Sequence, residues 1–496
     1  MSLEEDLQSL QIPPEFADDQ RRLICYSDAK TMEDESASLQ QALQEFGVLD
    51  RPMRFSFGGA KVEVWYLANE AYTVAEVIAA MRQRFETKIR FEADGRMGLL
   101  QLAVNDPLYP QQWALQKIEA AAAWNCVARA PAPQQVTVAI VDSGVMGDHE
   151  DLQATPKLGF PIIATASGPL ADNTGHGTML AGIIGAVSNN MLGIAGEGRN
   201  VRILSIKFTD ERTPPSALAA GLGVLAAVLL GAGVINCAWH VLATTPLLRL
   251  MIGFATQQGC VVVIAAGNYG SDNTSIPTLP ASWRNAIPGT IAVMASDRND
   301  FKCWFSNYGD GVDLAAPGQS ILSTGIYYVN ARYPESTGTS AASAHVSAAA
   351  ALLLSIDNWT PVEIRTHLNE SADRLPILWG TCISEGRLNL RRAVCGPFQI
   401  VAPAGGVPLQ GGTPFNVQWT LEYNSTIVQS AEISFRNAGN RAVILGGAVF
   451  GPFAANAGQV GQLVIVPIQP PGIQTVIRIR SLEKNLYTDS DVFEII

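Results

Sequence analysis

Charged residues are scarce in this chain: they make up 16% of its 496 residues, whereas hydrophobic residues make up 48%. Such an apolar composition predicts at least one large buried core. No long run of Lys or Arg occurs, and the formal net charge is −12, so we expect no nucleic-acid partner. At roughly 150 residues per domain, a chain of this length predicts about three domains.

The N-terminus lacks the apolar segment of a secretory signal, because its first 16 residues read MSLEEDLQSLQIPPEF and are acidic. Closely spaced cysteines are also missing: the nearest pair, Cys382 and Cys395, lies 13 residues apart. The spacing therefore predicts neither a disulfide framework nor a zinc site. Both absences favour a reducing, cytoplasmic location, with leaderless export as the alternative. The seven cysteines are Cys25, Cys126, Cys237, Cys260, Cys303, Cys382 and Cys395.

One uncharged stretch, residues 217–235, is long enough to be considered as a membrane span. Gly231 and Gly233 interrupt it, and neither a basic flank nor an aromatic belt surrounds it. We therefore expect no membrane span, but a buried helix over about 216–230 that leads into a strand.

Three regions of the chain differ in pattern. Residues 1–103 alternate strand and helix signals in the order β-α-β-β-α-β, which predicts a small α+β unit. Residues 104–397 contain short, fully apolar runs separated by helical stretches, as in a doubly wound parallel sheet covered on both faces. Residues 398–496 show about seven strand-like runs and no convincing helix, which predicts a β-sandwich.

In parallel α/β sheets the functional groups gather at the carboxyl ends of the strands, so candidate functional residues are expected there. Asp142 ends the apolar run VTVAIVD and is either a turn residue or a half-buried functional carboxylate. His176, one of only five histidines, lies between two glycines at a helix start. A lone histidine is commonly structural, but one beside a strand-tip aspartate is a candidate general base.

Two further strand or helix ends carry polar residues. Asn268 follows VVVIAAG and is either a turn residue or a donor that aims its amide at an oxyanion. Ser340 precedes a long apolar helix and is either an N-cap or a nucleophile beside the positive end of the helix dipole. Together, Asp142, His176 and Ser340 have the chain order of the Asp-His-Ser triad found in subtilisins.

The segments AIVDSGV, GHGTMLAG, AAGN and GTSAASAHV resemble the active-site motifs of the subtilase family of serine endopeptidases. The lead-in NDPLYPQQWALQKIEAAAAW and the phrase AVSNNMLGIAG are most similar to the thermitase branch. The resemblance covers about residues 104–397 and implies a subtilisin-like fold. It also implies that Ser340 is the nucleophile, His176 its base, Asp142 the residue that orients His176, and Asn268 an oxyanion donor.

The chain departs from the family pattern in two places. The helix after Ser340 lacks the usual methionine and proline, which are Ala341 and Ala344 here. In the strand that forms one wall for substrate, His240 replaces a glycine, which we expect to narrow or polarise the cleft and to allow contact with an acidic substrate residue. By resemblance, one wall comprises Ala238, Trp239 and His240, and the opposite wall Ala265, Ala266 and Gly267.

The resemblance also implies a structural calcium ion. Calcium takes six to eight oxygen ligands, so two carboxylates, an amide and three carbonyls form an adequate set. A metal-free turn is the alternative. The implied ligands are the side chains of Asp106, Asp151 and Asn190 and the carbonyls of Val187, Leu192 and Ile194.

Residues 1–103 stand where subtilases carry a propeptide, which implies an intramolecular inhibitor and folding template removed by cleavage near residues 95–105. A permanent accessory domain is the alternative. The leading functional hypothesis is thus a serine endopeptidase made as a zymogen and acting on peptides or proteins. The alternatives are a dedicated processing protease with a narrow substrate and a catalytically silent peptide-binding scaffold.

Overall fold

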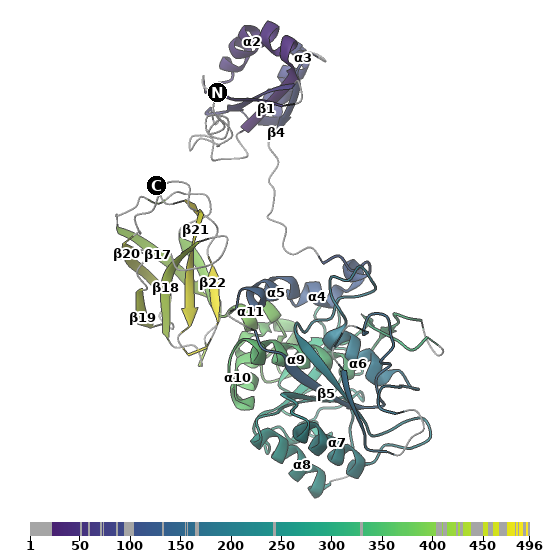
Figure 1. The fold of residues 1–496 in the computed structure, drawn as a ribbon. Helices are drawn as coiled ribbons and strands as arrows, with labels where there is room; N and C mark the ends of the chain where they lie inside the picture. The colour runs from purple at the N-terminus through teal and green to yellow at the C-terminus, as the bar shows by residue number, and fades with distance from the viewer. Residues whose placement is uncertain are drawn as a thin grey trace. The chain divides into compact units, whose positions relative to one another are not determined.

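Two compact units, Met1–Leu100 and Gln101–Ile496, make up the computed structural model. Each unit is described by itself (Figure 1). The structure describes residues 22–49, 52–57, 60–69, 72, 74–85, 88–93, 104–130, 133–153, 155, 157–163, 168–241, 245–327, 331–402, 409, 414–422, 425–426, 430–437, 450–454, 460–465, 474–481, 483–484, 486–489 and 493–494.

The first unit is an antiparallel sheet with two helices, in the chain order β-α-β-β-α-β. Asp28 starts the first helix by accepting a hydrogen bond from the backbone N–H of Thr31 at 2.9 Å. Leu23, Leu39 and Trp65 are buried in its core. The strands, in sheet order, are β2 (Met53–Phe57), β3 (Ala60–Tyr66), β1 (Arg22–Asp28) and β4 (Arg90–Ala93), and the helices are α2 (Ala29–Gln44) and α3 (Val74–Phe85).

The second unit is built on a nine-stranded sheet in which all neighbouring strands are parallel except β14 and β15. In sheet order the strands are β14 (Asp373–Arg374), β15 (Gly386–Arg387), β11 (Leu314–Pro317), β10 (Thr290–Ser296), β9 (Val261–Ala265), β8 (Val234–Cys237), β5 (Val136–Asp142), β7 (Val201–Lys207) and β6 (Lys157–Pro161).

The central strands are apolar throughout because both of their faces are covered. On β5, Val138 and Ile140 belong to one hydrophobic core, and Ala139 and Val141 belong to the other. Successive strand residues point to opposite faces, so a strand buried on both sides needs apolar side chains at every position. This explains the apolar runs in the sequence.

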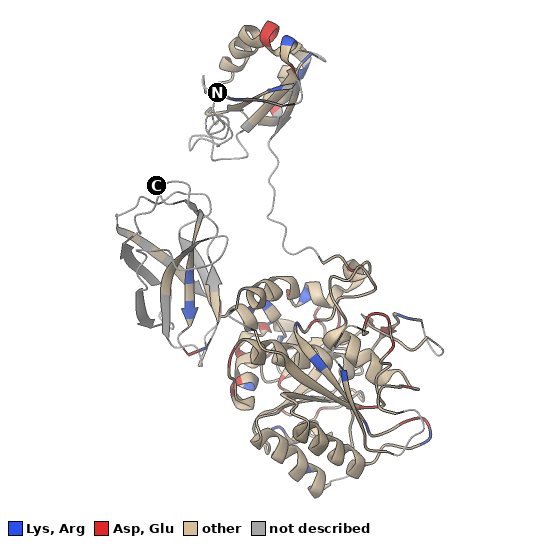
Figure 2. Ribbon diagram, in the orientation of Figure 1, with Lys and Arg blue, Asp and Glu red and all other residues tan. Residues whose placement is uncertain are grey.

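Helices supply the other half of each core (Figure 1). On one face α6 (His176–Gly185) and α9 (Thr339–Ile356) pack against the sheet, and on the other α7 (Ala217–Leu229) and α8 (Pro246–Gln257) do so. The helix expected over 216–230 is confirmed, with Ser216 as its N-cap. Neither α7 nor α9 carries a charged residue (Figure 2).

Among the described helices, α9 alone is long and apolar enough to cross a membrane, and 89% of it is buried inside the protein. Its apolar character is therefore accounted for by its central place in the fold.

A disulfide joins Cys126 on α5 (Ala120–Arg129) to Cys395 on α11 (Leu390–Cys395), although 269 residues separate the two cysteines. The expectation of no disulfide was wrong for this pair, because spacing along the chain cannot report cysteines that packing brings together. The other short elements of this region are α4 (Trp113–Lys117), α10 (Pro361–Ser371), β12 (Ile321–Leu322), β13 (Glu335–Ser336) and three 3₁₀ turns at Tyr109–Gln111, Ala281–Trp283 and Pro376–Leu378.

The described residues after 397 include the strands of two antiparallel sheets. Trp419 is buried, in a core that also includes Phe435 and Ile477 of the other sheet. One of the strand-like runs of this region, AVILGGAVF over 442–450, lies outside the described residues except for Phe450. The first sheet comprises β16 (Phe398–Ala402), β17 (Pro414–Leu421) and β20 (Val460–Ile465), and the second β19 (Phe450–Ala454), β18 (Ser430–Asn437), β21 (Gln474–Ser481), β22 (Tyr487–Asp489) and β23 (Phe493–Glu494).

The order of the large sheet locates its crevice. From β5 the chain runs to β6 and β7 on one side and then crosses to β8 on the other side. Such a reversal leaves an opening at the carboxyl ends of the strands, where ligands bind in open α/β sheets.

Candidate active site

Asp142 and His176 form a hydrogen-bonded pair at this edge of the sheet. Asp142 is the last residue of β5, and His176 is the first residue of α6. His176 Nδ1 lies 2.9 Å from both carboxylate oxygens of Asp142. The flanking Gly177 permits this approach, since a Cβ there would lie 2.1 Å from the carbonyl oxygen of Gly144.

Electrostatics favour the protonated form of His176. Burial acts to lower the pKa of the imidazole, but the charge and hydrogen bond of Asp142 outweigh it, and Asp172 adds to the effect. The net result is a raised pKa for His176. The side chain is nevertheless 40% exposed and lines the cleft described below.

Asp172 is a site residue that the sequence reasoning missed. It is fully buried, and its carboxylate accepts hydrogen bonds from the backbone N–H groups of Gly175 at 2.9 Å and Thr178 at 3.0 Å. It thereby satisfies free N–H groups at the start of α6 and holds the turn that presents His176. The available signal was the turn DNTG before the histidine, since an aspartate in a turn commonly accepts from the N–H two residues on, as Asp172 does from Thr174 at 3.0 Å.

Asn268 is held in a fixed orientation by Thr339. The Oδ1 atom of Asn268 accepts hydrogen bonds from the backbone N–H and the hydroxyl of Thr339, both at 2.9 Å. Because the oxygen is engaged, the amide nitrogen is the atom of this side chain that can donate a hydrogen bond into the cleft that Asn268 lines. The Thr339 hydroxyl also accepts from the N–H of Gly267 at 3.2 Å, which ties the end of β9 to the start of α9.

Ser340 lies in the first turn of α9, and its side chain reaches the same cleft. Its hydroxyl donates to the carbonyl oxygen of Ala238 at 3.4 Å. Deeper in the helix, Ser343 and Ser347 accept hydrogen bonds from the buried amide of Asn236 on β8 at 3.0 and 2.9 Å. These two serines anchor the helix that carries Ser340 to the sheet.

A cleft of about 730 Å³ brings these residues together. Of the expected substrate walls, Ala238, Trp239 and His240 line it, whereas Ala265 and Ala266 are buried and, like Gly267, lie outside its described lining. The indole of Trp239 donates to the carbonyl oxygen of Val141 at 3.0 Å, which fixes that wall beside β5. The four residues predicted from the sequence to carry the chemistry, Asp142, His176, Asn268 and Ser340, all line this cleft.

Comparison with known proteins agrees with this arrangement. Residues 134–393 match the model of the Subtilase family, Peptidase S8. This chain belongs to the subtilase family. The subtilase is 38% identical over 291 residues to "Thermitase" of Thermoactinomyces vulgaris, which covers 58% of this chain and 98% of that protein.

Two further relatives support the same assignment. The subtilase is 36% identical to "Thermophilic serine proteinase" of Bacillus sp. strain AK1, over 58% of this chain and 69% of the relative. A solved protease structure from Pseudoalteromonas arctica has a TM-score of 0.51 and 26% identity, and covers 59% of this chain and 98% of that one. The chain is a subtilisin-type serine endopeptidase with a subtilisin-like α/β fold.

The residues implied in calcium binding lie together, because Asp106 and Asp151 are hydrogen-bonded to the loop 187–194. Asp106 accepts hydrogen bonds from the N–H groups of Asn189 and Asn190 at 2.9 and 3.1 Å. Asp151 accepts from the Asn190 amide and from the N–H of Ile194, both at 2.8 Å. Two further hydrogen bonds hold this loop in place. The N–H of Val187 donates to the Asp151 carbonyl, and the N–H of Leu192 donates to Asn190 Oδ1.

This oxygen-rich set fits a hard cation. Burial raises the pKa of Asp151 to about 6, and the nearby carboxylate of Asp106 adds to the rise. Two carboxylates that repel each other at a partly buried site are the condition that a divalent cation relieves. In the described part of the chain, no three His, Cys, Asp or Glu side chains gather as metal ligands, so amide and carbonyl oxygens must complete the set.

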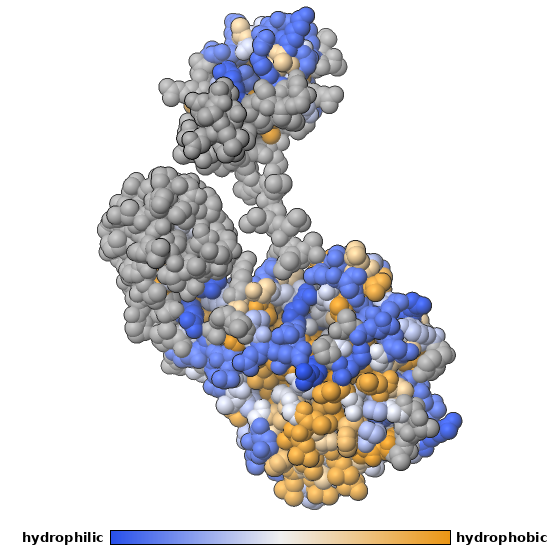
Figure 3. Space-filling view, viewed as in Figure 1, coloured by the Kyte–Doolittle hydropathy of each residue, from blue (hydrophilic) through white to orange (hydrophobic). Residues whose placement is uncertain are grey.

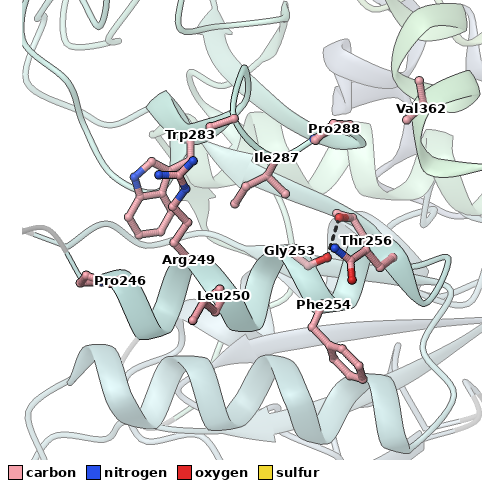
Figure 4. A pocket seen from close by; sticks show the side chains of 12 residues that line it. Pro246, Arg249, Leu250, Gly253, Phe254, Thr256, Trp283, Ile287, Pro288 and Val362 are labelled. Atoms are coloured by element: carbon pink, nitrogen blue, oxygen red, sulfur yellow. Dashed lines mark hydrogen bonds between the residues drawn. The ribbon is translucent and has the colours of Figure 1, made fainter.

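A second hollow of about 920 Å³ lies over α8 (Figure 4). Leu250, Phe254, Trp283 and Ile287 line it, and Arg249 is the one charged residue of its described lining. It adjoins exposed leucines of α7 and α8, where hydrophobic side chains gather on the surface (Figure 3). This hollow offers neither a carboxylate nor a histidine in its described lining, so the chemistry is assigned to the cleft of Ser340.

Proposed function

We propose that the subtilase hydrolyses peptide bonds through Asp142, His176 and Ser340. The observation that carries this proposal is the hydrogen-bonded Asp142–His176 pair in the cleft that also holds Ser340 and Asn268. His176 takes the proton of the Ser340 hydroxyl as its oxygen attacks the peptide carbonyl, and then gives that proton to the leaving amine. A water molecule then attacks the carbonyl of the acyl-enzyme while His176 takes the proton of that water. His176 passes the proton to the oxygen of Ser340, which leaves as the restored hydroxyl, and the acid product is released.

Reaction with a fluorophosphonate probe tests this proposal directly. The probe phosphonylates a serine only when a neighbouring base activates it. We expect the label on the peptide that contains Ser340. A folded protein that takes up no label would instead support the silent-scaffold alternative.

Asn268 is the proposed oxyanion donor, together with the backbone N–H of Ser340. We expect Asn268→Ala to lower kcat by about 10²–10³-fold, the range known for such a donor in a subtilisin, with little change in the thermal unfolding midpoint. Measuring kcat and KM on one peptide checks this.

A matched variant separates hydrogen-bond donation to the oxyanion from the support that Asn268 gives to Thr339. Asn268→Asp retains an oxygen that can accept from Thr339 but lacks the amide donor, so it is expected to be as slow as Asn268→Ala. Wild-type turnover in Asn268→Ala contradicts the proposed role.

Calcium is proposed as a structural ion held by Asp106, Asp151, Asn190 and the carbonyls of the same loop. When bound it supplies charge compensation there and takes no part in hydrolysis. We expect EDTA to lower the unfolding midpoint, and added calcium to restore it, because an ion bound only by the folded state stabilises that state. The control is Asn190→Ala, whose midpoint should respond much less; an EDTA-insensitive wild type contradicts the site.

Residues 1–103 are proposed to act as an intramolecular inhibitor and folding template, removed by self-cleavage near residues 95–105. Residues 95–103 lie outside the described part of the chain. The support is the compact α+β unit, with its own core, that precedes the peptidase region 104–397. A permanent accessory domain predicts instead that the purified protein stays in one piece.

Residues 398–496 are proposed to be a β-sandwich accessory domain, supported by the shared core of the two antiparallel sheets. A cytoplasmic location remains a prediction. The disulfide between Cys126 and Cys395 removes one of its two grounds, since stable disulfides are rare in reducing compartments.

A further inference from the structure

Two side chains face each other at the rim of the cleft. The hydroxyl of Tyr269 lies 2.6 Å from Nε2 of His240. Their rings are nearly perpendicular, with centroids 5.2 Å apart. His240 lines the cleft, and Tyr269 directly follows Asn268 in the chain.

This pair connects the continuations of two neighbouring strands. His240 lies three residues beyond the end of β8, and Tyr269 lies four residues beyond the end of β9. β8 and β9 are paired and parallel, so both continuations leave the sheet at the same edge. The His240–Tyr269 hydrogen bond therefore crosses the opening between them.

Both ends of this connection are firmly held. The N–H of Val241 donates to the carbonyl oxygen of Leu279 at 2.8 Å, which fixes the chain next to His240. The N–H of Tyr269 donates to Oδ1 of Asn307 at 2.9 Å, and Asn307 is fully buried. The backbone on both sides of the pair is thus fixed, whereas the side chain of Tyr269 is 59% exposed.

The small residues expected to form the opposite wall of the substrate pocket are missing from the described lining of the cleft. Ala265 and Ala266 are small, and small residues leave room for a large substrate side chain between the two continuations. Yet both are buried and lie outside the described lining of the cleft, which stops at Asn268. The described lining thus includes His240 but none of the small residues expected opposite it.

We propose that the His240–Tyr269 pair is a bar across this opening, which restricts cleavage to peptides with a small side chain before the scissile bond. This inference rests on the proposed endopeptidase function. Tyr269 is 59% exposed, so water can pair with these groups whenever their hydrogen bond opens. A large apolar side chain that enters must part the two rings and also displace that water from the hydroxyl and the imidazole nitrogen. The side chains of glycine, alanine and serine are short enough to bind without parting the His240–Tyr269 pair.

The bar also bears on the hypothesis that His240 binds an acidic substrate residue. Nε2 of His240 is engaged by Tyr269, so a substrate carboxylate must compete with that hydroxyl. Small-residue selection and acidic-residue selection predict opposite results for a peptide with glutamate before the scissile bond.

The test uses three fluorogenic peptides that differ only in the residue before the scissile bond: alanine, phenylalanine or glutamate. For wild type we expect the highest kcat/KM with alanine. Tyr269→Phe keeps the ring and removes the hydroxyl, and should raise the phenylalanine-to-alanine ratio of kcat/KM about tenfold, the lower end of what pocket contacts contribute to selectivity. His240→Gly removes the bar and should raise this ratio further.

A double variant and a control complete the design. Tyr269→Phe combined with His240→Gly should match His240→Gly alone, because residues that act through one contact are not additive. Tyr327→Phe removes a hydroxyl that accepts from the Glu150 N–H at 2.9 Å, outside the described lining of the cleft, and should leave the ratio unchanged.

Three outcomes overturn the bar. The first is a wild type that prefers phenylalanine, and the second is a ratio unchanged in both single variants of a protein that still cuts the alanine peptide. The third is a glutamate preference in wild type that both single variants lose. A wild type that cuts none of the peptides and takes up no fluorophosphonate overturns the proposed function, and the bar with it.

Discussion

Replacing Ser340 with alanine is expected to lower peptide hydrolysis by about 10⁶-fold, the scale of loss when the nucleophile of such a triad is removed. The physical reason is that Asp142 and His176 act only through the Ser340 oxygen, so without it they have no proton to take. Substrate binding and oxyanion stabilisation remain, and they leave a residual rate of hydrolysis above that of the uncatalysed reaction in water. Initial rates on a fluorogenic peptide measure the loss.

The same variant tests self-processing. Purified wild type is expected to yield fragments of about 11 and 42 kDa, in proportion to the lengths of the two units. Ser340→Ala is expected to remain whole at 52.9 kDa. Fragments in both proteins would assign the cut to another protease, and an intact, active wild type would favour a permanent accessory domain.

The matched control is Ser355→Ala on the same helix. The Ser355 hydroxyl is buried and donates to the carbonyl oxygen of Leu352 within α9 at 2.7 Å, several turns away from the cleft. Its loss should leave turnover near the wild-type level. A comparable loss in both variants would point to damage to α9 rather than to the removal of a nucleophile.

Replacing Asp142 with asparagine is expected to reduce kcat by about 10⁴-fold near neutral pH. The carboxylate accepts the Nδ1 proton of His176 and so keeps Nε2 free to take the serine proton. An asparagine amide can instead donate to Nδ1, which places the imidazole proton on Nε2 and leaves no base facing Ser340.

The pH profile of this variant separates the electrostatic role of Asp142 from a purely structural one. Asp142 raises the pKa of His176 against the opposing effect of burial, and only the neutral imidazole acts as a base. In wild type the acid limb of kcat/KM should therefore lie above the ordinary histidine value of about 6.5. In Asp142→Asn the remaining activity should show an acid limb at lower pH.

The control for the pH profile is Asp148→Asn, which removes an exposed carboxylate six residues further along the chain. Its rate and acid limb should match those of wild type. An unshifted acid limb in Asp142→Asn would mean that Asp142 does not control the charge state of His176.

Much of the site was predictable because its signals are local. The run VTVAIVD predicts a strand buried on both faces, and its last residue is the aspartate of the pair. The glycines beside His176 predict a close backbone approach, and Gly177 indeed meets the carbonyl of Gly144. These inferences need only a few neighbouring residues and the two-residue period of a strand.

Other features depend on residues that are far apart in the chain. Asp172 accepts a hydrogen bond from the Ser143 hydroxyl at 3.0 Å because the turn before α6 packs against the end of β5. Cys126 and Cys395 meet because α5 and α11 pack together. His240 and Tyr269 meet because β8 and β9 are neighbours in register. No local period reports such contacts.

The sequence by itself determined the class of fold, the family and the four residues proposed for chemistry, since buried strands and strand-end motifs are written in consecutive residues. The tertiary structure alone decided what surrounds them. It set the orientation of Asn268 by Thr339 and the burial of Ala265 and Ala266, and it brought Tyr269 against His240. These depend on how strand ends align across the sheet, and that alignment is a property of packing.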